Sequence, residues 1–164
     1  MTLSENLLRK LGEQRPTSPG RETLTHADAA SGWTAVLTTE QADALSCRLW
    51  DATLRRSTPG QSLDAKGLRQ KAEAVAAGVK GLMEPLRLVE CDETRLEAIL
   101  RSDEPTQRGG KRSHYELRLD AQRRASLKRF QADSDSSAKR VQAPFTLTHE
   151  VLGHLVDDLA QALS

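Results

Sequence analysis

The sequence predicts an α+β domain in which a mainly antiparallel β-meander is covered by two or three helices, after a flexible N-terminal segment. Three observations predict this fold class. Apolar residues recur at helical spacing near both ends of the chain and between residues 63 and 82, strand-like patterns dominate residues 86–120, and residues 13–32 are rich in Pro, Gly, Ser and Thr. Helices and strands that are segregated along the chain favour this layered arrangement over β-α-β units.

Length, charge and cysteine content narrow the class of protein. A chain of 164 residues is long enough for one hydrophobic core and short for two, so residues 32–164 are expected to form a single domain behind a flexible segment at 1–31. The 24 Lys and Arg against 23 Asp and Glu give no net charge that would favour nucleic acid or an acidic membrane surface. Cys47 and Cys91 lack metal-site spacing, and no signal peptide or membrane-length apolar run is visible. We therefore expect free thiols, a cytoplasmic location and no membrane partner.

The first residues predict a short amphipathic helix over residues 2–11, because Leu3, Leu7, Leu8 and Leu11 repeat at helical spacing and Gly12 is a suitable stop. A helix of about ten residues is marginal alone in water, so its leucine face needs a surface to pack on. Two alternatives follow. The helix either docks on a protein partner through these leucines, at the end of a flexible tether, or packs on the protein's own core.

Residues 32–82 predict one strand followed by two helices. "GWTAVLT" (32–38) has the β-branched and aromatic character of a strand, and residues 39–56 switch to a helical period that places Leu45 and Leu49 on one face. Thr38 and Gln41 have the spacing of a capping box at this switch. A second helix over 63–82 contains three glycines whose cost is explained by close approach of a neighbouring helix: Gly67, Gly78 and Gly81.

The remaining sequence predicts strands that end in a helix. In "HYELRL" (114–119), Tyr115, Leu117 and Leu119 alternate with polar residues, as a sheet with one wet face requires. "LRLVEC" (86–91) and "VQAPFTLT" (141–148) are also strand-like, whereas 95–101 and 123–132 fit the meander but have helix-forming composition. After them, the apolar spacing predicts a terminal helix that buries Leu152, Leu155 and Leu159.

Residues 36–52 and 146–162 align without a gap and share identical residues at six positions. Both copies are expected to be a strand running into a helix, related either by duplication or by convergence. The second copy contains "HEVLGH", which looks like the H-E-x-x-H pattern of zinc hydrolases. His149 and His154 are five residues apart, however, so they diverge by about 140° on a helix and are poorly placed to share one metal ion.

The strongest cluster of functional residue types is basic. Residues 108–130 contain eight Lys and Arg against two carboxylates, and the glycines at 109 and 110 suit a hairpin tip like the wing of a winged helix. The candidate nucleic-acid contacts are Arg108, Lys111, Arg112, Arg118 and Lys128. Aromatic residues make up only 3% of the chain, which argues against a stacking surface for single strands.

These features predict a non-catalytic module that binds an unknown protein partner or itself, with its N-terminal helix as the expected attachment point and with no cofactor. No phosphate loop or nucleophile elbow supports an enzyme. Nucleic-acid binding through the basic hairpin is the main alternative. A zinc-dependent hydrolase that uses residues 149–154 is less favoured.

Overall fold

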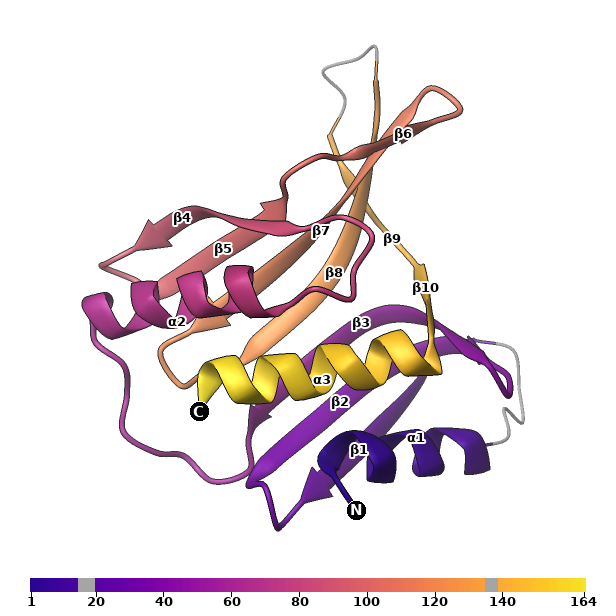
Figure 1. Ribbon diagram of the computed structural model, residues 1–164. Coiled ribbons are helices and arrows are strands. Elements are labelled where there is room, and N and C mark those ends of the chain that lie inside the picture. Colours follow the sequence, from indigo (N-terminus) through magenta and orange to yellow (C-terminus); the bar gives the residue numbers. More distant parts are fainter. Residues whose placement is uncertain (15–19, 135–138) are drawn as a thin grey trace.

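In the computed structural model, residues 1–14, 20–134 and 139–164 are described, and they form one ten-stranded antiparallel sheet and three helices. The helices are α1 (Leu3–Glu13), α2 (Ala65–Gly78) and α3 (His149–Leu163). All three lie on the same face of the sheet, with α3 between α1 and α2 (Figure 1). The predicted α+β fold with a helix-covered meander is therefore confirmed, and the opposite face carries none of these helices.

The seven main strands run in the spatial order β1-β2-β3-β8-β7-β5-β4. Their bounds are β1 (Glu22–Asp28), β2 (Trp33–Ala42), β3 (Ser46–Arg56), β4 (Leu86–Asp92), β5 (Glu97–Ser102), β7 (Lys111–Asp120) and β8 (Ala125–Asp133). Three short strands, β6 (Thr106–Arg108), β9 (Val141–Ala143) and β10 (Phe145–Thr148), pair with β7, β8 and β3 respectively. The two ambiguous segments, 95–101 and 123–132, therefore contribute strands and not helices.

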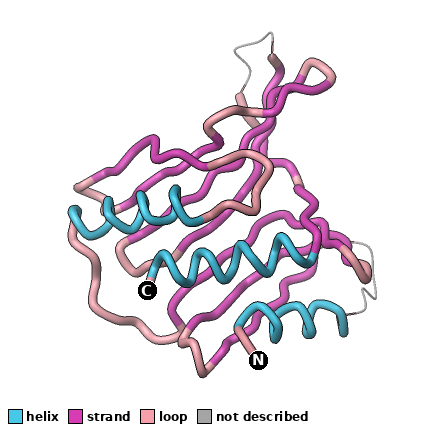
Figure 2. Tube along the Cα trace, viewed as in Figure 1, coloured by secondary structure: helices cyan, strands magenta, loops and turns pink. Residues whose placement is uncertain are grey.

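The sheet divides between β3 and β8. Residues 52–54 of β3 pair with β8, whereas residues 46–49 pair with β10. β9 pairs with the far end of β8, and Pro144 separates β9 from β10. Figure 2 shows these two strands following one another toward the start of α3. The β9–β10 segment therefore fills the opening between the two halves of the sheet.

The helix layer is held together by close backbone approach. A Cβ atom built on Gly153 of α3 would lie 3.2 Å from Leu8 Cδ1 of α1, and one on Gly78 of α2 would lie 4.0 Å from Ala162 Cβ. Gly81 likewise faces α3, with a built Cβ 3.8 Å from Val151 and His154, but a Cβ at Gly78 or Gly81 would make only ordinary contact, so the predicted helix contact does not require these glycines; Gly67 lies beside the Asp64 cap. The predicted core residues of α3 are all buried: Leu152, Leu155 and Leu159.

The N-terminal part of the chain corrects the expectation of a flexible segment at 1–31. In α1, Leu3, Leu7 and Leu11 are 5%, 0% and 1% exposed and belong to the same core as the sheet. The polar side of α1 lies along β1, where Asn6 donates to Asp28 Oδ1 and Lys10 donates to the Thr25 carbonyl. β1 itself was expected to lack structure, yet it pairs with β2 over its whole length. Residues 15–19 of the predicted flexible stretch lie outside the described residues.

The helix predicted over 39–56 is wrong, because this segment forms the end of β2, a turn and β3. The register of the β2–β3 pair shifts near Thr39, so Trp50 has no partner on β2. The buried residues of β3 are Cys47, Leu49, Ala52 and Leu54. A β-bulge inserts one extra residue between Leu49 and Ala52, and the resulting step of three residues imitates helical spacing.

This error also removes the proposed repeat of a strand running into a helix. Residues 146–162 form that arrangement, but residues 36–52 form a hairpin in which Thr38 is a strand residue and not a helix cap. Leu45, expected on the buried helix face, is 78% exposed at the turn. The shared residues therefore do not correspond to a shared supersecondary structure. Among the helices described, none is long and apolar enough to cross a membrane.

Candidate functional site

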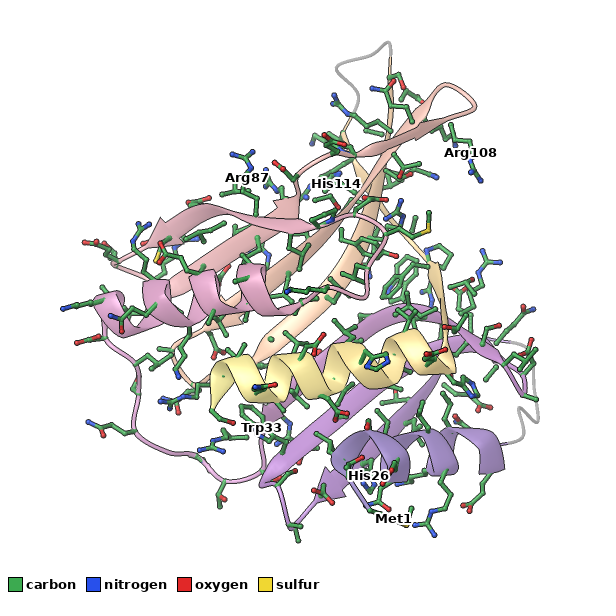
Figure 3. All side chains as sticks on the ribbon, in the orientation of Figure 1. Met1, His26, Trp33, Arg87, Arg108 and His114 are labelled. Carbon is green, nitrogen blue, oxygen red and sulfur yellow. The ribbon has the colours of Figure 1, made fainter. Side chains whose placement is uncertain are left out.

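The sheet face opposite the helices, called here the open face, presents an ordered set of charged and aromatic side chains. β7 alternates as predicted, with Tyr115, Leu117 and Leu119 buried on the helix side. Glu116 and Arg118 therefore lie on the open face with His114, which is labelled in Figure 3. Neighbouring strands add Arg101 from β5 and Phe130 from β8, which pair with Glu116 and His114 in the sheet register.

Glu116 is the centre of this arrangement. Its side chain is 2% exposed although it lies on the face without helices. Arg140 Nη1 and Arg101 Nε contact Glu116 Oε1 at 2.9 and 3.0 Å. Arg118 Nε lies 3.4 Å from Oε2 and also reaches Glu97 at 2.7 Å through Nη1. The three guanidiniums that surround the carboxylate thus come from β5, β7 and the segment before β9.

Hydrogen bonding controls the charge of Glu116. Burial alone would raise the pKa of its carboxyl, but hydrogen bonds from Arg140 and Arg101 outweigh burial and hold the pKa below its usual value. Glu116 is therefore a carboxylate at neutral pH. The guanidiniums themselves stay accessible, because the side chains of Arg101, Arg118 and Arg140 are 40%, 49% and 33% exposed.

Two aromatic rings extend the cluster. His114 and Phe130 are stacked with their centroids 5.9 Å apart, and the Arg140 guanidinium lies 4.0 Å from the centre of the Phe130 ring. Arg140 Nη1 is also 3.3 Å from His114 Nε2. Burial and the nearby Arg140 charge lower the pKa of His114, which favours a neutral imidazole that accepts a hydrogen bond from Arg140.

A second cluster with the same chemistry lies beside β9. Glu40 contacts Arg21 at 3.2 Å and Arg48 at 3.3 Å, and the Arg21 guanidinium lies 3.6 Å from the centre of the Trp50 ring. Gln142 connects the two clusters, because it pairs with Phe130 in the sheet and donates to the Trp50 carbonyl at 2.9 Å. Two of the five Phe, Trp and Tyr side chains, Trp50 and Phe130, therefore belong to these clusters, each next to a guanidinium.

A shallow depression of about 250 Å³ adjoins the Glu116 cluster. It is lined by Glu97, Glu116, Arg118, Leu119, Asp120, Arg124, Ser126 and Lys128. Most of these side chains are charged, so the depression suits a polar ligand and not an apolar one.

The predicted nucleic-acid residues fall into two separate groups. Arg108, Lys111 and Arg112 lie at the β6–β7 hairpin, whose two-residue turn is made by Gly109 and Gly110 with φ of 59° and 73°. Figure 3 shows Arg108 on this projecting hairpin, away from the helices. Within the described part of the chain, these three cations form no ion pair with a carboxylate. By contrast, Lys128 lines the depression and Arg118 is held between two carboxylates.

The predicted partner-binding residues are also not available as one free surface. Leu3, Leu7 and Leu11 belong to the core, and the half-buried Leu8 packs against it. A partner reaches these leucines only if α1 leaves its site, which corrects the expectation of a tethered docking helix.

The two histidines of the zinc-like segment point to different surroundings. His154 is 66% exposed and lies 3.9 Å from Glu150, while His149 is half-buried at the start of α3 with its Nε2 atom unpaired. Across residues 1–14, 20–134 and 139–164, no group of three or more His, Cys, Asp and Glu side chains is placed to hold a metal ion. Thr148 caps α3 by accepting a hydrogen bond from Val151 N, and Glu150 lies in the first turn of the helix. Thr148 and Glu150 are therefore explained by their roles at the start of the helix.

A buried ion pair lies on the helix side of the sheet. Glu84, in the segment between α2 and β4, accepts from Arg129 Nη2 and from Thr106 Oγ1, both at 2.7 Å. The Arg129 guanidinium also lies 4.4 Å from the centre of the Tyr115 ring. These contacts attach the segment after α2 to β6 and β8, which is a structural role.

Sequence reasoning identified Arg118 and Lys128 but missed Glu116, Arg140, Trp50 and Phe130 as site residues. The alternation in β7 already placed Glu116 on the wet face, next to Arg118 in a stretch with eight cations and two carboxylates, and this was the available signal. No protein-family model, curated protein or solved structure matches this chain. The candidate site therefore has to be interpreted from its own geometry.

Proposed function

We propose that this protein is a non-catalytic module that binds another protein through the open face of its sheet. The observation that carries the proposal is the line of guanidiniums and half-buried aromatic rings on this face, from Trp50 to His114. Trp, Tyr and Arg are enriched among the few residues that contribute most of the binding energy at protein interfaces.

The distribution of charge supports a polypeptide as the partner. On the open face, carboxylates alternate with guanidiniums, as in the contacts of Glu40, Glu97 and Glu116. A phosphate backbone would meet repulsion at each carboxylate, since nucleic-acid binding depends on neutralising successive phosphates. A polypeptide offers both signs of charge and apolar side chains, so it suits an interleaved surface better.

Nucleic acid is the second candidate, and one observation favours it. Arg108, Lys111 and Arg112 lie on the β6–β7 hairpin without a paired carboxylate among the described residues, with Arg108 opposite Lys111 in the sheet register. We propose a cytoplasmic location for either function, because Cys47 and Cys91 are free thiols.

A random-peptide library displayed on phage tests the proposal. Peptides selected on the wild-type protein are expected to bind a control variant, Arg69→Ala on the exposed side of α2, with unchanged Kd. They should bind Trp50→Ala at least about tenfold more weakly, as expected for loss of an aromatic anchor. Trp33 is 2% exposed, so its fluorescence checks that Trp50→Ala stays folded.

Three results would contradict the proposal. The first is that selection enriches no peptide, and the second is that Trp50→Ala binds the selected peptides as well as Arg69→Ala does. The third is a wild-type oligomer that Trp50→Ala dissociates in analytical ultracentrifugation, because the open face would then bind a second copy of the chain. Salt-sensitive oligonucleotide binding that is lost on neutralising Arg108, Lys111 and Arg112 would instead support the nucleic-acid function.

A further inference from the structure

We propose that the cluster of Arg101, Arg118 and Arg140 around Glu116, together with the adjoining depression, is a preformed subsite for carboxylates of an acidic segment of the partner protein. This inference rests on the proposed function and deepens it, since it names the chemistry that the open face recognises.

The first step is the position of the three guanidiniums. Arg140 and Arg101 share Glu116 Oε1, and Arg118 is held near Oε2. Arg140 is fixed further by the Phe130 ring, and Arg118 by Glu97. Arginine side chains on a surface normally occupy many conformations, and ordering each one costs about 0.5–1.5 kcal/mol on binding. In this cluster much of that ordering is present before a ligand arrives.

The second step is the unused hydrogen-bonding capacity. A guanidinium has five N–H donors in a planar fork, and a bidentate contact with a carboxylate uses two of them. The donors directed at Glu116 lie beneath the surface, where the carboxylate is 2% exposed. Because the Arg side chains are one-third to one-half exposed, their remaining donors are accessible to an oxyanion from outside.

The third step is the charge balance. The cluster and the depression contain three carboxylates and five cations, namely Glu97, Glu116, Asp120, Arg101, Arg118, Arg124, Lys128 and Arg140. Two positive charges are therefore left without a partner. A segment with two neighbouring acidic residues would neutralise them, and the depression of about 250 Å³ gives its side chains a place to enter.

The test uses the full chain and tetraglutamate with blocked ends as the probe. Arginine Nε–Hε resonances are followed by NMR during titration at low salt. The signals of Arg101, Arg118 and Arg140 are expected to shift together along one binding curve, whereas that of Arg69 stays in place. In Arg140→Gln, affinity for tetraglutamate should fall roughly three- to tenfold, as expected for loss of one partly exposed charged contact. Arg69→Gln removes the same charge from α2 and should leave the affinity unchanged.

Other outcomes overturn the inference. If all surface arginines shift alike, or if both variants weaken binding equally, attraction is diffuse and the cluster is not a subsite. If inorganic phosphate binds as tightly as tetraglutamate, the site takes a small free anion. If hexathymidylate binds more tightly at the same salt concentration, the ligand is nucleic acid. If tetraglutamate does not bind while the phage-selected peptides still need Trp50 for binding, the carboxylate subsite is refuted and the proposed function stands.

Discussion

Replacement of Leu7 by alanine tests whether the N-terminal helix is an integral part of the fold. Leu7 is fully buried between Leu3 and Leu11 on the inner side of α1, and these leucines join the core formed with the sheet and α3. A tethered docking helix would expose Leu7 in the free protein, and its loss would then leave the free energy of unfolding unchanged. The structure predicts a large loss.

The size of the loss follows from burial. Truncation of a fully buried leucine removes apolar contacts and leaves a cavity, at a cost of about 2–5 kcal/mol. We expect about 3 kcal/mol for Leu7→Ala, because Ala is the best helix former and offsets a few tenths. With a urea dependence of about 2 kcal/mol per molar, the midpoint of unfolding should fall by roughly 1.5 M.

Urea unfolding followed by circular dichroism and by Trp33 fluorescence measures this change. Arg9→Ala is the matched control, because Arg9 is exposed on the same helix and its removal should alter stability by less than about 0.5 kcal/mol. Equal midpoints for Leu7→Ala, Arg9→Ala and the wild-type protein would refute the packing of α1 described here.

Three further predictions concern other parts of the fold. Gly78→Ala should stabilise the protein by about 0.5 kcal/mol, because the new Cβ meets Ala162 at an ordinary 4.0 Å. Gly109→Ala should destabilise it by about 1 kcal/mol, because φ at this residue is 59°. Thermal unfolding of the two variants measures both changes in stability. Burial would raise the pKa of Glu84, but hydrogen bonds from Arg129 and Thr106 outweigh burial and lower the pKa below its usual 4.5. The stabilisation by Glu84 is therefore complete above pH 4.5 and is lost as the pH falls through the lower folded value, so Glu84→Gln should cost about 3 kcal/mol at pH 7 and flatten the acid side of the stability profile. Burial raises the pKa of Cys47 to about 12, so a thiol reagent at pH 8 should modify Cys91 in the native protein and Cys47 only after unfolding; equal rates would contradict the burial of Cys47.

Elements with unbroken periodicity were predictable from the sequence. The alternation of Tyr115, Leu117 and Leu119 and the leucine spacing of α3 each continue through the whole element, so pattern and structure agree. β3 was not predictable in the same way, because the bulge at Trp50 changes the side of the sheet to which later residues point. β1 was missed because Leu24 is its only buried large apolar residue, and α1 supplies polar contacts that no local pattern reveals.

The candidate site was harder to predict from the sequence than the fold, and the reason is physical. Its members come from β5, β7, β8 and the segment before β9, so their proximity depends on the sheet order and not on spacing along the chain. Arg140 lies between the strand-like segments 123–132 and 141–148, in a stretch where no pattern predicts a helix or strand, and residues 135–138 lie outside the described residues. A basic excess between residues 108 and 130 was visible, yet only Arg118 of these cations contacts Glu116, while Arg108, Lys111 and Arg112 lie on the separate β6–β7 hairpin.

The stability of the fold does not by itself require a carboxylate at Glu116. Moving a carboxylate out of water costs several kcal/mol, and the hydrogen bonds from Arg140 and Arg101 offset this cost for the charged form. An apolar residue at this position would fold as well in many proteins, but it would leave Arg101, Arg118 and Arg140 free to point elsewhere. The carboxylate instead holds three guanidiniums in one place on the open face, beside Phe130 and the depression. Because such preorganisation lowers the entropic cost of binding, the arrangement of this face fits the ligand recognition proposed above.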